Sequence, residues 1–87
     1  MSVRLPYAIT VRGERVDRQA LIGCLVDNES GLSRAFFRKN GALILLFRYR
    51  GDARIVLRKA EKQLGCERPV PDTIQYQSAK AEITKLS

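Results

Sequence analysis

The chain contains no histidine and only two cysteines. Histidine is the commonest general base and metal ligand, and Cys24 and Cys66 lie far apart and outside any CxxC pair, so no zinc site is predicted. Paired carboxylates, GxGxxG or GxxxxGK[ST] phosphate loops and a cysteine with a base beside it are also missing. These absences favour a protein that is not an enzyme and holds no metal or cofactor.

Long apolar runs are missing too. No segment approaches the roughly 20 apolar residues that a membrane span needs, and the N-terminus lacks the apolar region of a signal peptide. We therefore expect a soluble, cytoplasmic protein without a membrane partner, in which both cysteines are buried, reduced thiols.

Acidic residues are few, since 9 Asp and Glu stand against 16 Lys and Arg, for a net charge of +7. By itself such an excess favours an anionic partner, such as nucleic acid, an acidic protein or a membrane surface, and does not choose among them; nucleic acid or an acidic protein is the predicted partner. Most of the basic residues are arginines, which suit two-pronged contacts with phosphate or carboxylate. The 87 residues, 45% of them hydrophobic, predict one small domain over residues 1–87.

The segment 40–51 contains the longest apolar run and predicts a central strand buried on both faces. Alternate side chains of a strand point to opposite faces. One face is predicted to carry Leu43, Leu45, Phe47 and Tyr49, and the other Ala42, Ile44, Leu46, Arg48 and Arg50.

The segments before the central strand predict one strand and two helices. Val3–Arg12 alternates as a half-buried strand, with Pro6 marking an edge or a place where its missing N–H is harmless. Asp17 predicts an N-cap for a helix from Arg18 to about Val26, in which Gly23 indicates a close strand or an earlier end. Its predicted inward residues are Val16, Leu21, Cys24 and Leu25. A short helix is expected over Leu32–Lys39, with Arg34, Phe37 and Arg38 on one face, where Phe37 stacks on a base, packs against a partner or belongs to the core.

The segments after the central strand predict a third helix and a last strand. Asp52 predicts the N-cap of the helix and Gly65 its end. Thr73–Ser78 alternates as a strand. In residues 79–87, Ala79, Ile83 and Leu86 fit one side of a helix, and Ala79, Ala81 and Ile83 fit a continued strand; a short helix or a loosely held C-terminal arm is the favoured prediction. The predicted inward stripe of the third helix is Ala53, Val56, Leu57, Ala60 and Leu64. The outer face of this helix carries Arg54, Arg58 and Lys62, which form either a solvated face or a ridge that binds phosphates or acidic side chains.

The order strand, helix, short helix, strand, helix, strand predicts an α+β two-layer sandwich with about three strands in a mixed sheet and the helices on one face. The first two strands are expected to be parallel. The uncovered face is predicted to combine Arg4, Thr10, Arg12, Gln75 and Gln77 with one set of the central strand.

Two functions fit this organisation. The first is a small basic accessory or regulatory protein that binds RNA or DNA, in which arginines contact phosphates and an aromatic ring stacks on a base. The second is a protein-interaction module or assembly subunit, for example a homodimer through an apolar sheet face, with an acidic partner. The predicted nucleic-acid-binding residues are Arg48, Tyr49, Arg50, Arg54, Arg58, Lys62, Arg34, Phe37 and Arg38.

Overall fold

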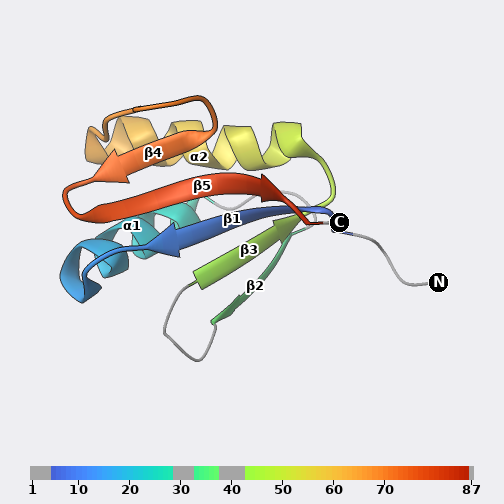
Figure 1. The fold of residues 1–87 in the computed structure, drawn as a ribbon, viewed down its shortest axis with the longest axis horizontal. Coiled ribbons are helices and arrows are strands. Elements are labelled where there is room, and N and C mark those ends of the chain that lie inside the picture. The colour runs from blue at the N-terminus through green and yellow to red at the C-terminus, as the bar shows by residue number, and fades with distance from the viewer. Residues whose placement is uncertain (1–4, 29–32, 38–42, 87) are drawn as a thin grey trace.

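The computed structural model describes residues 5–28, 33–37 and 43–86. They form five strands and two helices, and the strands make one sheet in the order β2-β3-β1-β5-β4 (Figure 1). Every strand pairing is antiparallel. The elements are β1 (Tyr7–Arg12), α1 (Arg15–Asp27), β2 (Ser33–Phe37), β3 (Leu43–Phe47), α2 (Arg50–Leu64), β4 (Thr73–Tyr76) and β5 (Ala79–Lys85).

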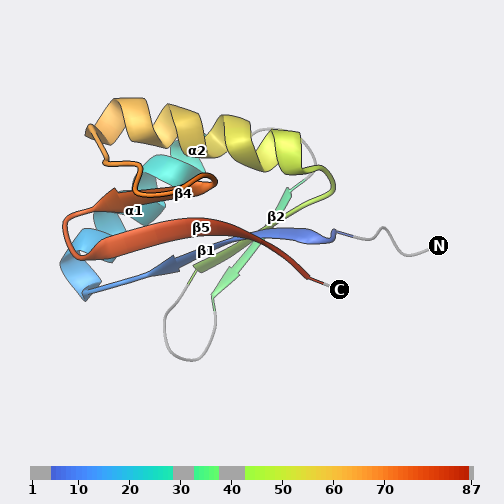
Figure 2. The same ribbon diagram turned by 45° about the horizontal axis from the view of Figure 1, so that its top comes forward.

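The molecule has two layers, because both helices pack on the same face of the sheet (Figure 2). This confirms the α+β class and the placement of the helices. The core lies between the layers, where Ile9, Leu45 and Ile83 are neighbours on adjacent strands. Burial of these side chains is the main favourable contribution to folding. The helices contribute Leu21, Cys24, Leu25, Ala53, Val56, Leu57 and Ala60 to this core.

The sheet differs from the prediction in strand number and direction. The segment predicted as a short helix over Leu32–Lys39 contains β2, which pairs antiparallel with β3. Apolar residues in this segment fit a helical spacing, but the Asn40-Gly41 pair in the sequence between the two strands is also typical of a hairpin turn. Hydrogen bonding to β3 makes residues 33–37 a strand and not a helix. The first strand and the segment 43–47 were expected to be parallel, but β1 and β3 are antiparallel neighbours. The unpredicted strand β2 lies between them in the chain, so the chain reverses direction once more before β3 pairs with β1.

For residues 79–87 the favoured prediction of a short helix or a loosely held arm is wrong, and the alternative of a strand holds for Ala79–Lys85, which form β5 between β1 and β4. The alternation of Ala79, Ala81 and Ile83, all buried, places these side chains on the helix-covered face. A strand here satisfies the backbone hydrogen bonds of two neighbouring strands, which a helix would leave open.

The segment 43–47 is extended as predicted, although β1 and not β3 occupies the middle of the sheet. Leu45 and Phe47 are fully buried under the helices, so Ile44 and Leu46 lie on the opposite face. Pro6 comes directly before β1, where its missing N–H removes no ladder hydrogen bond.

Helix α1 begins at Arg15, three residues earlier than predicted, with Glu14 at the N-cap position. Asp17 therefore lies in the first turn, where its carboxylate accepts hydrogen bonds from the backbone N–H and the hydroxyl of Ser78 at 3.1 and 2.8 Å. Val16 was expected to face inward but is 77% exposed, because Leu21 follows it by five positions and a helix with about 3.6 residues per turn places the two on different faces.

Helix α2 follows its predicted stripe, with Ala53, Val56, Leu57 and Ala60 buried. It begins at Arg50, so Asp52 is in the first turn and Tyr49 holds the N-cap position. Gly65 ends the helix with a positive φ of 65°, the left-handed conformation that favours glycine. Both cysteines are free thiols; Cys24 is buried as expected, whereas Cys66 is only half-buried.

Candidate functional site

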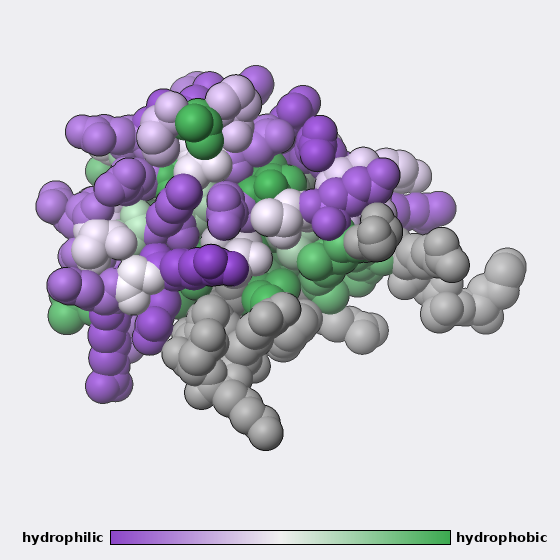
Figure 3. Space-filling view, viewed as in Figure 1, coloured by the Kyte–Doolittle hydropathy of each residue, from purple (hydrophilic) through white to green (hydrophobic). Residues whose placement is uncertain are grey.

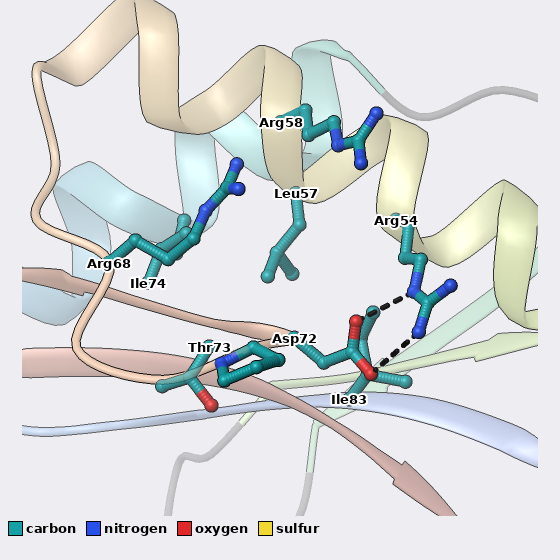
Figure 4. Close-up of a pocket in the computed structure, with 9 residues that line it drawn as sticks. Arg54, Leu57, Arg58, Arg68, Asp72, Thr73, Ile74 and Ile83 are labelled. Carbon is teal, nitrogen blue, oxygen red and sulfur yellow. Dashed lines mark hydrogen bonds and ion pairs between the residues drawn. The ribbon is translucent and has the colours of Figure 1, made fainter.

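A pocket of about 210 Å³ lies between α2 and the segment that leads from α2 into β4 (Figure 4). Its floor is apolar, because Leu57, Ile74 and Ile83 are 4%, 1% and 9% exposed. Its charged lining consists of Arg54 and Arg58 from α2 and of Arg68 and Asp72 from the connecting segment.

Asp72 and Arg54 form a two-pronged ion pair in this pocket. Arg54 donates from Nε to Oδ1 of Asp72 at 2.7 Å and from Nη2 to Oδ2 at 3.3 Å. Arg50 adds a longer contact, with its Nε 4.0 Å from Oδ2. The hydrogen bond from Arg54 is the main cause that lowers the pKa of Asp72 below its ordinary value. Asp72 therefore stays ionised and fixes the orientation of the Arg54 guanidinium group.

The backbone around Asp72 is also fixed. Its φ of 61° lies in the left-handed region, which Asp tolerates better than most residues. Its carbonyl oxygen accepts a hydrogen bond from the N–H of Ile83 at 2.9 Å, which ties the segment to β5. The carboxylate that orients Arg54 is thus held by the sheet and not by a free loop.

The remaining two arginines of the pocket differ in their partners. Arg68 forms an ion pair with Glu61, one turn after Leu57 on α2. Arg58 has no carboxylate within ion-pairing distance in the part of the chain that the structure describes. When Arg50 is added to the three arginines of the pocket, four guanidinium groups stand against the two carboxylates of Asp72 and Glu61. The site therefore has two positive charges in excess.

Basic and aromatic side chains also meet where β3 leads into α2. The Arg48 guanidinium carbon lies 5.4 Å from the centre of the Tyr49 ring, and that of Arg50 lies 5.3 Å from the Tyr7 ring. Both distances are within the range of a cation–π contact. Tyr49 is 58% exposed, so its ring is available to a partner.

The predicted site residues are thus only partly brought together. Arg48, Tyr49 and Arg50 form the corner at the start of α2, and Arg54 follows one turn later. Lys62 is exposed in the last turn of α2 and does not line the pocket. Arg34 and Phe37 belong to β2, where they pair in register with Leu46 and Leu43, and Arg38 lies outside the described residues.

The sequence prediction missed Arg68 and Asp72. Both lie in the segment between α2 and β4 that contains Pro69 and Pro71 and that was predicted only as a turn. No periodic pattern marks them, and they reach Arg54 and Arg58 only because β4 folds back along α2 (Figure 2).

The sheet face that no described helix covers, here called the open face, is mixed in character. Thr10, Arg12 and Gln75 lie on it as predicted, and Lys80 pairs in register with both Arg12 and Gln75. Gln77 lies instead in the turn between β4 and β5, with a φ of 53°, and Arg4 is outside the described residues. Figure 3 shows mostly hydrophilic side chains over α2 and the left ends of the strands, with smaller hydrophobic areas toward the right.

The apolar side chains of the open face are little exposed. Ala8 and Ile44 are 1% and 3% exposed, and Leu46 is half-buried. Of the two alternatives for the strand 43–47, the uncovered set is therefore the aliphatic one that leads toward Arg48, and not the set with Leu45 and Phe47.

Within the described ranges, no three His, Cys, Asp or Glu residues lie close enough together to hold a metal ion. The two helices described are too short and too polar to cross a membrane. Comparison with models of protein families, with curated proteins and with solved structures finds no match to this chain.

Proposed function

We propose that this protein is a small basic accessory or regulatory protein, without catalytic activity, that binds RNA or DNA through the arginine-rich surface at the start of α2. The observation that carries the proposal is the succession of Arg48, Arg50, Arg54 and Arg58, for which Asp72 is the one carboxylate in ion-pairing reach among the described residues. Four closely spaced arginines whose positive charge is neutralised only in part by a single carboxylate favour a polyanionic partner. Free thiols at Cys24 and Cys66 are compatible with a cytoplasmic protein.

The mode of binding follows from the side chains. Guanidinium groups contact phosphate oxygens through two parallel hydrogen bonds, which position the nucleic acid without reading its sequence. The exposed Tyr49 ring adds a surface on which an unpaired base can stack. Binding should therefore be weakly sequence-specific, strongly salt-dependent and tighter for single strands than for duplexes.

The test is a titration of labelled single-stranded and duplex oligonucleotides at several salt concentrations. The double variant Arg50→Gln with Arg58→Gln leaves the Arg54–Asp72 ion pair in place. It should weaken binding about tenfold or more and reduce the slope of log K against log salt by about one for each phosphate that the variant no longer neutralises.

The matched control is Arg15→Gln. Arg15 is an exposed arginine at the start of α1, at the opposite end of the molecule from the start of α2 (Figure 1). This variant should bind like the parent protein. No binding at micromolar protein, or equal weakening in the control and the double variant, would contradict the proposal.

A protein-interaction module or assembly subunit is the second candidate function. It is supported by Leu46, a half-buried aliphatic side chain on the open face. A homodimer through this face, or an acidic partner that also contacts the arginines, would bury Leu46 fully. Size-exclusion chromatography with light scattering tests the homodimer: a monomer at all concentrations counts against it, and Leu46→Lys should dissociate a dimer if this face forms it.

A further inference from the structure

The pocket under α2 brings arginines from two different elements toward one hollow. Figure 4 shows Arg54 and Arg58 extending from α2 and Arg68 extending from the connecting segment, with Leu57 between them. A surface that follows a nucleic-acid backbone needs arginines only in a row, whereas here they line a concave site. The site is therefore shaped for a compact anionic group.

The charge of the pocket matches such a group. The two excess positive charges around Asp72 and Glu61 are close to the charge of about −1.5 to −2 that a phosphate monoester carries at neutral pH. A phosphodiester within a nucleic-acid backbone carries only one negative charge. Arg58, which pairs with no described carboxylate, is the arginine most available to it.

The size and the floor of the pocket fit the same ligand. A volume of about 210 Å³ is enough for a phosphate group with part of its sugar. The apolar floor of Leu57, Ile74 and Ile83 excludes water on one side, and a lower local dielectric strengthens the attraction between guanidinium and phosphate. Asp72 keeps Arg54 aligned at the edge of this space.

We infer that this pocket binds a terminal phosphate of a nucleic acid, clamped between Arg58 and Arg68, so that the protein distinguishes phosphorylated ends from hydroxyl ends. The inference rests on the proposed nucleic-acid binding and assigns one part of that surface to a phosphate monoester. Arg54 contributes as a third, pre-aligned donor.

The experiment compares one single-stranded oligonucleotide in three forms, with a 5′-phosphate, with a 3′-phosphate and with hydroxyl groups at both ends. At least one phosphorylated form should bind about tenfold more tightly than the hydroxyl form, as expected for new charge-assisted hydrogen bonds. Millimolar inorganic phosphate should remove this gain while the hydroxyl form stays bound.

Variants assign the gain to the pocket. Arg58→Gln and Arg68→Gln should each abolish the preference for the phosphorylated form, and Arg58→Lys should retain part of it, because lysine keeps the charge but not the two-pronged geometry. Lys59→Gln is the matched control, since Lys59 is an exposed neighbour of Arg58 on α2 that does not line the pocket. All three residues are exposed, so the fold should tolerate these changes.

The outcomes separate this inference from the broader proposal. Equal affinities for the three forms would overturn the pocket assignment, while binding of the hydroxyl form would still support nucleic-acid binding. If no oligonucleotide binds, but inorganic phosphate shifts the NMR signals of the Arg58 and Arg68 side chains in the parent protein, and no longer shifts the signal of the arginine that remains in each single Gln variant, the pocket is supported as an anion site and the nucleic-acid proposal fails. Failure of both probes overturns both.

Discussion

Arg54 and Asp72 pair through two hydrogen bonds across 18 positions of the chain, so a single carboxylate links α2 to the segment that enters β4. The same carboxylate lies 4.0 Å from Arg50 and occupies the edge of the arginine pocket. It both orients one guanidinium group and neutralises part of the positive charge. These two roles have opposite consequences for stability and for anion binding.

Replacing Asp72 with Asn should lower the melting temperature slightly at pH 7 and raise the affinity for nucleic acid. The stability effect should be small, because the pair is partly exposed. Asn tolerates the positive φ of Asp72, so the backbone should not be strained. The affinity should rise because a third excess charge faces the ligand. Calorimetry and the oligonucleotide titration measure the two effects.

The effect of Asp72→Asn on stability should also depend on pH. Because the folded-state pKa of Asp72 lies below its ordinary value of 3.8, the ion pair contributes stability above that pH and loses it as the pH falls through the folded-state pKa. The difference in melting temperature between the parent and the variant should therefore vanish in strong acid. Glu67→Gln is the control for the predicted gain in affinity, because it removes the same charge from a residue that does not line the arginine pocket. An equal gain in nucleic-acid affinity in this variant would contradict the explanation that the charge acts at the pocket.

Gly13→Ala should unfold the protein or destabilise it by about 3 kcal/mol or more. Gly13 has a φ of 133°, and an added Cβ would lie 2.5 Å from the Cα of Ala79 and 2.6 Å from the carbonyl oxygen of Ser78. Both are backbone atoms where the turn enters β5, and backbone atoms there cannot move aside cheaply. Urea unfolding measures the change in stability. Gly51→Ala is the control, since its Cβ would meet nothing within 4 Å, and a normal stability of Gly13→Ala would show that β5 does not lie where the structure places it.

Gly23→Ala should stabilise the protein by about 1 kcal/mol, because Ala is the better helix former. Gly23 lies inside α1 and is exposed, and an added Cβ would meet nothing within 4 Å. The sequence suggested that a strand passes close to Gly23 or that the helix ends before it. In the described residues neither is the case, because α1 continues to Asp27 and the space beside Gly23 is open. Thermal unfolding should show a rise of about 4–8 °C. A decrease would indicate that this face of α1 packs against another molecule.

The two thiols should react slowly with a disulfide reagent in the native state and quickly in urea. Burial is the main cause that raises the pKa of both Cys24 and Cys66, which lowers the fraction of reactive thiolate at pH 7–8. Cys66 should react first, because it is half-buried whereas Cys24 is 5% exposed. Cys24→Ala and Cys66→Ala assign the two phases, and fast reaction of Cys24 in the native protein would contradict its burial.

Several features of the fold follow directly from the local pattern of the chain. In α2 the spacing of Ala53, Val56, Leu57 and Ala60 identifies the buried stripe, and the alternation around Ile9 identifies the buried face of β1. These predictions hold because the period of a helix or a strand is a local property, and burial of one face selects it. The start of α2 at Arg50 also places Arg48, Tyr49 and Arg50 at one corner, as their closeness in sequence predicts.

The tertiary structure alone decides which strands pair and what faces the arginines. Residues 33–37 and 79–85 fit more than one local structure, and they become β2 and β5 because β3 and β1 offer backbone hydrogen bonds that must be satisfied. Tyr7 pairs with Lys85 across nearly the whole chain, a contact that no local pattern contains. For the same reason Arg68 and Asp72 join Arg54 and Arg58 only after β4 has been placed beside β5. The sequence by itself determines the excess of positive charge. The long-range pairing of strands determines which carboxylates neutralise part of that charge and where a pocket forms.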